Sequence, residues 1–406
     1  SECEICVVAT GDTRYLNSEQ TLERSILQYA RGDQTSSDQP DKYYRTTGEM
    51  LEQFEWLGAD TAHQLVVEKP RRIWDRCNKV TLLKDGFFPP ELDKTSDQFH
   101  GTINENITNI YGDSPPEPVR QRLQTEINAI EEHDFAGIYD LVSRLMETTH
   151  RDDEPFTTRG SVGSSLVAYL MGITEINPLQ PHYRCPVCQW TEFPTPSCDH
   201  YTAFDLEVTD CPECGTELIR DGHDIPFEVF AGLDGETIPD IDFNVRPGYR
   251  ERLVDQLEEL VGTENILGTG CDEFPSNKWA RNTVNDYVDE HDIAKSEAER
   301  DRLSETLSNV RMTISGQSWG FMVLPEDNDP HEFTPLEPAG DSPSRFPVSH
   351  FDYQDLQGQI LKLDLLGHDD PKQLRYLKEH TGLHWLDVPL DDPETIQLFR
   401  DIEVLG

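Results

Sequence analysis

Apolar residues recur every three or four positions in several parts of the chain, a pattern typical of amphipathic helices. This spacing predicts helices over residues 46–68, 116–132, 135–147, 248–261 and 283–309. The clearest is 116–132, where proline suits the start and one stripe is apolar. That stripe consists of Val119, Leu123, Ile127 and Ile130.

Shorter apolar runs, rich in β-branched residues, predict strands. They lie at residues 7–10, 238–245, 320–325 and 360–367. The first runs into Thr-Gly-Asp, which indicates a turn at the edge of a sheet. Polar stretches at 32–41 and 326–347 predict loops.

Two of the predicted strands contain acids. Asp240 and Asp242 stand two positions apart in 238–245, so they share one face, about 7 Å apart along the strand. Asp364 is flanked by leucines, and a buried carboxylate is costly unless it is paired or bound to a metal. The pattern favours a divalent metal site. The alternative is acids at solvated strand ends, or an Asp364 bonded to nearby backbone.

A Gly/Ser turn precedes another apolar helical run. It contains Gly160, Ser161, Gly163, Ser164 and Ser165, directly after Arg159. A helix N-terminus offers backbone N–H groups and the positive end of its dipole, which suits a triphosphate. Arginine adds a bidentate donor. Gly/Ser-rich helix starts are also common without any ligand.

Cysteine spacing gives the strongest local motif. Two C-P-x-C pairs, Cys185/Cys188 and Cys211/Cys214, are separated by 22 residues, and two such tight turns aim four thiolates at one zinc ion. Four thiolates leave no open position, so we expect one structural Zn²⁺. Cys198 and His200 are alternative ligands, and the Cys3/Cys6 pair has no visible partner.

The chain is strongly acidic. The 78 acids against 34 bases give a net charge of −44, spread along the chain. A dispersed acidic surface suits high salt, where screening reduces self-repulsion; the alternative is an ordinary acidic protein that avoids polyanions. The densest basic patch is Lys69-Pro70-Arg71-Arg72, which could contact a phosphate backbone or simply be solvated.

The start of the sequence lacks a basic segment followed by an apolar one, and no apolar run approaches 18 residues. Patterned cysteines suit a reducing compartment. These features predict a cytoplasmic protein with no membrane segment.

Taken together, these stretches resemble the C-family replicative DNA polymerases, and the PolC-type DNA polymerase III alpha subunit most closely. The resemblance extends over nearly the whole chain. It is carried by VVATGDTRYL (7–16), TTGEMLEQFEWLG (46–58), TRGSVGSSLVAYLMGITEINPL (158–179), PHYRCPVCQWTEF (181–193), DCPECGTELIRDGHDIPFE (210–228), PDIDFN (239–244) and LKLDLLGHDDP (361–371).

The resemblance implies an α+β fold: a polymerase-β-like nucleotidyltransferase palm with a mixed β-sheet, an inserted four-cysteine zinc ribbon and a small helical thumb. It implies that Asp240, Asp242 and Asp364 are catalytic and hold two Mg²⁺ ions. The Gly/Ser turn, with Arg159 and Lys278, would bind the phosphates of a dNTP. The implied reaction is transfer of dNMP to a primer 3′-hydroxyl on primer-template DNA.

The resemblance also divides the chain into segments. Residues 1–20 would be the end of a PHP domain, 21–180 a helical and N-terminal palm part, and 181–228 the zinc insertion. The palm strand and helix with the Asp pair would occupy 229–275, the thumb 276–312, and the rest of the palm 313–367. Residues 368–406 would start the fingers, so we expect the chain to stop before most of them. A separate polypeptide would then supply the fingers, with other replisome subunits as partners.

Some stretches depart from the family pattern. Arg14 replaces the usual PHP histidine, the Gly-Gln-His-Pro-Gly-Gly stretch reads GQSWGF (316–321), and a basic segment is replaced by GTGCDEFPSNKWAR (268–281). These departures leave two alternatives open. One is a non-catalytic, zinc-containing scaffold or binding module, and the other is a nucleotidyltransferase for a different acceptor.

Overall fold

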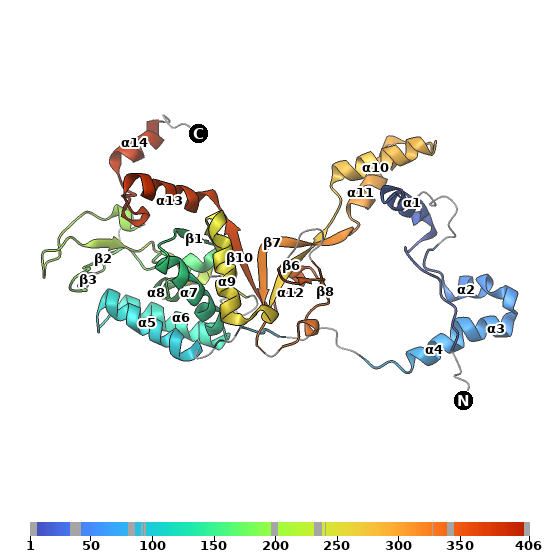
Figure 1. Ribbon diagram of the computed structural model, residues 1–406, viewed down its shortest axis with the longest axis horizontal. Coiled ribbons are helices and arrows are strands. Elements are labelled where there is room, and N and C mark those ends of the chain that lie inside the picture. Colours follow the sequence, from blue (N-terminus) through green and yellow to red (C-terminus); the bar gives the residue numbers. More distant parts are fainter. Residues whose placement is uncertain are drawn as a thin grey trace. The chain divides into compact units, whose positions relative to one another are not determined.

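The structure is a computed structural model, and it describes residues 6–32, 42–79, 86–90, 92, 95–195, 202–230, 238–239, 241–326, 328–338 and 345–401. The chain forms two compact units, each described by itself below. The smaller contains residues 1–82 and 272–313, and the larger contains 83–271 and 314–406 (Figure 1).

A seven-stranded mixed sheet forms the centre of the larger unit. Its order is β1 (Phe156–Arg159), β5 (Ile241–Val245), β10 (Leu361–Gly367), β7 (Thr313–Val323), β6 (Ile266–Glu273), β9 (Val348–Ser349) and β8 (Leu336–Glu337). β10 runs parallel to β5 and antiparallel to β7, while β1 pairs antiparallel with β5. The predicted mixed sheet is therefore present.

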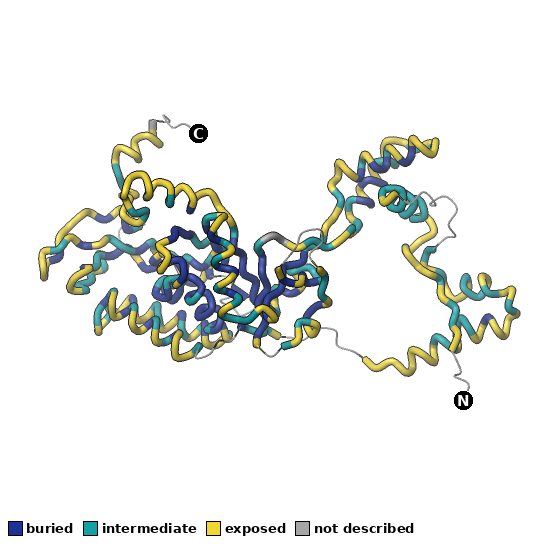
Figure 2. The backbone as a smooth tube through the Cα atoms, viewed as in Figure 1, coloured by how far each residue is buried: buried dark blue, intermediate teal, exposed yellow. Residues whose placement is uncertain are grey.

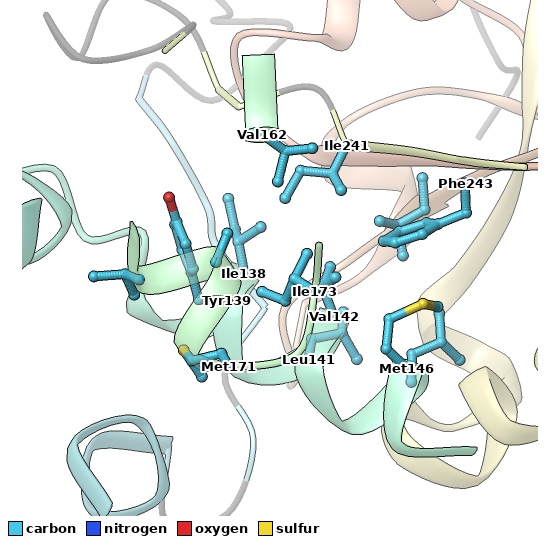
Figure 3. Close-up of a cluster of buried hydrophobic side chains, with 14 of the residues drawn as sticks. Ile138, Tyr139, Leu141, Val142, Met146, Val162, Met171, Ile173, Ile241 and Phe243 are labelled. Carbon is cyan, nitrogen blue, oxygen red and sulfur yellow. The ribbon is translucent and has the colours of Figure 1, made fainter. Parts of the chain in front are cut away.

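One face of this sheet packs into the main hydrophobic core of the unit. Burial alternates along β5, so that Ile241, Phe243 and Val245 are fully buried while the residues between them are less so. This period of two is what a strand with one covered face requires. Figure 3 shows Ile241 and Phe243 among side chains of the neighbouring helix, including Ile138, Val142 and Met146. The opposite face carries the polar residues of β5, together with a second buried apolar cluster that includes Met322 of β7.

Helices cover the apolar face and flank the sheet. They are α5 (Thr95–Tyr111), α6 (Glu117–Glu132), α7 (Ala136–Arg151), α8 (Leu166–Leu170), α9 (Arg250–Val261), α12 (Tyr353–Leu356), α13 (Asp369–Thr381) and α14 (Pro393–Asp401). α5 packs on α7, α7 on α9, and α6 on α8. Figure 2 shows the buried residues of this unit gathered along the sheet and the helices beside it, with α13 and α14 mostly exposed.

A separate three-stranded sheet carries the cysteines. Its order is β3 (Thr191–Glu192), β2 (His182–Arg184) and β4 (Ile219–Asp221), all antiparallel. The two C-P-x-C pairs follow β2 and precede β4, and this sheet with its two cysteine turns forms a small ribbon.

The smaller unit is helical. It contains α1 (Thr21–Ala30), α2 (Thr47–Gln53), α3 (Ala59–His63), a π-helical segment (Gln64–Glu68), α4 (Lys69–Trp74), α10 (Asn277–Glu290) and α11 (Glu297–Ser308). Ile26 of α1 is fully buried with Val284 of α10 and Leu303 of α11. Residues 1–82 thus belong to the same compact unit as α10 and α11.

Three local expectations need correction. The described residues 7–14 form no strand, and Tyr15 only makes an isolated bridge to Tyr43. The strand predicted at 320–325 begins earlier, at Thr313. A strand not foreseen, β6, occupies 266–273, where glycine and threonine weakened the apolar signal.

The predicted helices are found: 46–68 contains α2, α3 and the π-helical segment, and the other ranges correspond to α6, α7, α9, α10 and α11. Among the described residues, the longest helix has 17 residues, and none has the length and apolar character needed to cross a bilayer.

Candidate metal and nucleotide site

Two of the three predicted acids lie side by side on the face of the large sheet that does not pack against α7. Asp242 of β5 and Asp364 of β10 are direct Cα partners in the parallel ladder. Paired residues on neighbouring strands project from the same face, so the two carboxylates are neighbours. Asp240 lies outside the described residues. The sequence separates Asp242 from Asp364 widely, and the sheet register is what unites them.

Both carboxylates are shielded from solvent and incompletely bonded. The side chain of Asp242 is 14% exposed and that of Asp364 8%. Each has one oxygen, Oδ1, that is buried and accepts no hydrogen bond from the described residues. Burial raises the pKa of Asp364; the ion pair with Lys362 opposes that rise, and the charge of Asp242 adds to it. A cation between the carboxylates would relieve this cost.

Basic side chains hold the other oxygen of each acid. Lys362 Nζ donates to Asp364 Oδ2 at 2.6 Å, and the same ammonium lies 4.7 Å from the centre of the Tyr353 ring. Arg159 donates from Nη2 to Asp242 Oδ2 at 2.8 Å. Arg159 was predicted from the sequence, but as a phosphate ligand. Lys362 was missed, although its spacing of two from Asp364 in a strand signals a shared face.

Asn244 extends this polar face. It follows Asp242 by two positions, its Nδ2 donates to Thr157 Oγ1 at 3.3 Å, and its Oδ1 is buried and accepts no hydrogen bond from the described residues. Carboxylate and amide oxygens are the ligands that Mg²⁺ prefers. The donor set therefore fits a divalent cation, and Asn244 is a polar residue that the sequence analysis did not single out.

The Gly/Ser turn begins beside these acids. Arg159, the last residue of β1, is the direct partner of Asp242, and Gly160 follows it. Gly160 has φ 89° and ψ −157°, a conformation that only glycine adopts readily. Residues Ser161–Ser164 then form one 3₁₀ turn. The turn therefore starts next to Asp242 in the sheet.

The start of α8 differs from the expectation. Its backbone N–H groups at Leu166 and Val167 donate to the buried carboxylate of Glu126 at 2.9 and 3.0 Å. Ser165 caps the helix, and its hydroxyl also donates to Glu126. Ser164 is buried, with its hydroxyl bonded to the carbonyl of Ser161. These amides are already occupied, so the start of α8 offers no free donors to a phosphate.

The remaining predicted phosphate contact belongs to the smaller unit. Lys278 lies exposed in the first turn of α10, whose N-cap is Ser276. It is not among the residues that the larger unit brings together, and its role stays a prediction.

The four predicted zinc ligands converge. All four sulfur atoms lie within 4.8 Å of one another. Sγ of Cys185 is 3.4 Å from that of Cys214, and Sγ of Cys188 is 3.6 Å from that of Cys211. Zn–S bonds of about 2.3 Å in a tetrahedron give S–S separations of about 3.8 Å, so the geometry fits zinc. Cys198, His200 and Cys3 lie outside the described residues, and Cys6 is exposed.

A buried polar network joins this ribbon to the helices. Asp221 of β4 accepts from Arg184 Nε at 2.7 Å and from Asn177 Nδ2 at 3.0 Å. Asn177 also donates to the Tyr111 hydroxyl of α5, which bonds His182 of β2. Opposite charges and satisfied donors let these groups be buried without a large penalty. The ribbon is therefore fixed to α5 through specific contacts.

Comparison with known proteins now places the chain. Residues 97–289 match the family of the bacterial DNA polymerase III alpha NTPase domain. That segment contains the Gly/Ser turn, the four cysteines, Asp242 and most of α10. This segment of the chain is thus similar to that polymerase domain.

More particularly, the chain is similar to PolC-type DNA polymerase III over nearly its whole length. It is 38% identical to the PolC-type enzyme of Thermotoga petrophila over 404 residues, 37% to that of Pediococcus pentosaceus over 410, and 36% to that of Bacillus subtilis over 404. These matches cover 98 to 100% of this chain but only 28 to 29% of each relative. The resemblance stated from the motifs is confirmed.

Proposed function

We propose that this chain provides the catalytic palm of a PolC-type DNA polymerase, which transfers dNMP from a dNTP to a primer 3′-hydroxyl. The observation that carries the proposal is the in-register pairing of Asp242 and Asp364, each with a buried oxygen that no described residue bonds. Such a pair suits a divalent cation better than a structural role, because unrelieved carboxylates are costly.

Asp242 and Asp364, with Asp240 two positions before Asp242, would hold two Mg²⁺ ions. When bound, the ions would favour the ionised primer hydroxyl and neutralise charge on the triphosphate and the leaving pyrophosphate. Lys362 holds Oδ2 of Asp364, while Oδ1 accepts no hydrogen bond from the described residues. The group of four cysteines would hold one structural Zn²⁺ away from the chemistry.

The nucleotide would lie against the turn that follows β1. Gly160, Ser161 and Gly163 present main chain beside the acids, and Gly160 lacks a side chain that would block close approach. The Arg159 side chain is 58% exposed, so its guanidinium can exchange Asp242 for a phosphate. Lys278 of the thumb-like helices remains a second proposed phosphate contact.

Primer-template DNA and a fingers polypeptide are the proposed partners. The described bases of 69–79 (Lys69, Arg71, Arg72, Arg76 and Lys79) supply positive charge on a chain of net charge −44. In residues 368–401, proposed as the start of the fingers, Leu386, Leu390 and Phe399 are 60 to 71% exposed. Large exposed apolar side chains of this kind are typical of an interaction surface.

Primer extension tests the proposal. The chain is assayed with primer-template DNA, dNTPs and Mg²⁺, alone and with a separately expressed fingers segment of a PolC-type relative, at salt from low to molar levels. We expect extension when the fingers are supplied, and none with Asp364→Asn. Calorimetry in parallel should show Mn²⁺ binding to the wild type that the variant lacks.

Two outcomes would contradict the proposal. Absent extension in every mixture, together with absent Mn²⁺ binding, would favour a non-catalytic scaffold. Extension that survives Asp364→Asn would place the chemistry elsewhere.

A further inference from the structure

A buried ion pair on α6 contacts the residues that end the Gly/Ser turn. Glu126 is fully buried, and Arg122, one helical turn earlier, donates from Nε to Glu126 Oε1 at 2.5 Å. A carboxylate placed so deeply needs several partners to offset its desolvation. Its partners identify what it holds.

Apart from Arg122, those partners belong to the segment 165–167. The N–H of Leu166 donates to Oε1 of Glu126, while the N–H of Val167 and the hydroxyl of Ser165 donate to Oε2. Both oxygens accept hydrogen bonds, which is the pattern of an ionised carboxylate. The negative charge also lies at the positive end of α8.

Arg122 completes the attachment from the other side. Its Nη2 donates to the carbonyl of Ser164 at 2.5 Å and to that of Ile225 at 3.0 Å. The guanidinium also lies 5.5 Å from the centre of the Phe227 ring. Arg122 therefore holds the carbonyl of Ser164, and Glu126 holds the donors of the three residues that follow it.

We propose that Glu126 and Arg122 are positioning residues that set the main chain of the Gly/Ser turn for a nucleoside triphosphate. The inference rests on the proposed function of that turn. It also assigns the roles within the motif: Gly160, Ser161 and Gly163 face the nucleotide, while Ser164, Ser165 and the α8 amides serve as attachment. A buried anion at α8 would repel a triphosphate placed on those same amides.

The chain offers a matched control. Asp140 and Arg144 of α7 form a second ion pair at the same i, i+4 spacing, and the Asp140 side chain is only 2% exposed. Arg144 holds Asp140 with two hydrogen bonds, at 2.9 and 2.7 Å. Among the described residues, Asp140 makes its side-chain hydrogen bonds to Arg144 and not to the turn, so Asp140→Asn breaks a comparable pair without touching the turn.

The experiment compares Glu126→Gln, Arg122→Lys and Asp140→Asn with the wild type. Hydrogen exchange of peptides covering 160–168 reports the order of the turn, and thermal unfolding reports overall stability. Calorimetry measures binding of dATP with Mg²⁺, and separately of Mn²⁺ alone. The wild-type protein must first show measurable binding of dATP and of Mn²⁺, because the variants are compared with those affinities.

We expect Glu126→Gln to speed exchange in 160–168 and to weaken dATP binding about 10-fold, with Mn²⁺ affinity unchanged. Arg122→Lys should act in the same direction but less strongly, since it keeps the charge and loses the fork to two carbonyls. Asp140→Asn should lower the unfolding temperature without either effect.

The proposal is overturned if Glu126→Gln destabilises like Asp140→Asn yet leaves exchange and dATP affinity at wild-type values. If Glu126→Gln does not fold, Arg122→Lys decides by the same two readouts. Wild-type protein that binds Mn²⁺ but no dATP would refute the nucleotide role, while the exchange data would still show whether the pair orders the turn.

Discussion

The two candidate metal sites of the larger unit are built in opposite ways. The four cysteines lie within 30 residues of one another, on two turns of one small sheet, and their sulfurs already converge. Asp242 and Asp364 are separated by 122 positions and meet only because β5 and β10 pair in parallel. One site is local and closed, and the other depends on the whole sheet.

This difference separates stability from chemistry. Four thiolates saturate a tetrahedral ion and leave no position for a substrate. The acids keep one unbonded oxygen each, and their positively charged neighbours Lys362 and Arg159 act as counter-ions. We therefore expect that damage to the cysteines will act through folding, and that damage to the acids will act through activity.

The largest expected effect is on activity. Asp242→Asn and Asp364→Asn should each lower nucleotidyl transfer by about 10³-fold or more, because each removes a charge that binds the metal. Single-turnover primer extension with the fingers supplied would measure this. Unfolding temperatures close to the wild type would sharpen the comparison, whereas a variant that loses activity only by unfolding would break it.

Zinc removal should act on stability instead. Cys211→Ser, or treatment with a chelator, should release one Zn²⁺ per chain, measured by mass spectrometry of bound metal. We expect the ribbon to lose its structure, since structural zinc contributes on the order of 10 kcal/mol to small zinc folds. Mn²⁺ affinity at the acids should change little. A parallel loss of Mn²⁺ binding would show that the two sites are coupled, through α5 and the Asp221 network.

Lys362→Met should have an intermediate effect. It leaves the buried Asp364 without its counter-ion, which costs about 3 kcal/mol in comparable pairs. The burial of Asp364 and the charge of Asp242 would then raise the pKa of Asp364 without opposition from Lys362. Urea unfolding should show this loss without divalent ions, and added Mn²⁺ should restore much of it. Absence of that recovery would argue against a cation beside Asp364.

The smallest effects come from one glycine at each site. Gly160 and Gly215 both have positive φ, at 89° and 73°. Alanine at either should cost about 1 kcal/mol in urea unfolding. Only Gly160→Ala should also weaken dATP binding in calorimetry. Equal effects of the two substitutions on dATP would deny the turn its proposed role.

The sequence predicted what depends on short spacings. Cys185 to Cys214 form a motif whose geometry two tight turns determine, and the alternation around Asp242 and Asp364 revealed strands with a polar face. The pairing of the two strands that carry Asp242 and Asp364 was expected from the family resemblance, because spacing alone does not determine which strands become neighbours. The counter-ion Lys362 could have been predicted from the sequence, because it lies two positions before Asp364 and alternate residues of a strand share one face.

Long-range partners could not be predicted in this way. Glu126 lies in a helix whose stripe is otherwise regular, and the single acid at a buried position was its only signal. Its bonds reach residues about 40 positions away. The grouping of α1 with α10 and α11 is likewise a product of tertiary packing, because helical periodicity shows which face is apolar but not what covers it.

The parallel alignment of β5 and β10 has a consequence for how this protein can change over time. Between these strands the chain makes an excursion of more than one hundred residues, including α10 and α11, before it returns. Doubling a loop adds only about 0.6 kcal/mol of closure entropy, so the connections around α10 and α11, which lie between β6 and β7, can gain or lose residues at little cost. A single residue inserted inside β10 would turn Asp364 toward the apolar side. Tolerance to insertions should therefore fall sharply where β10 begins.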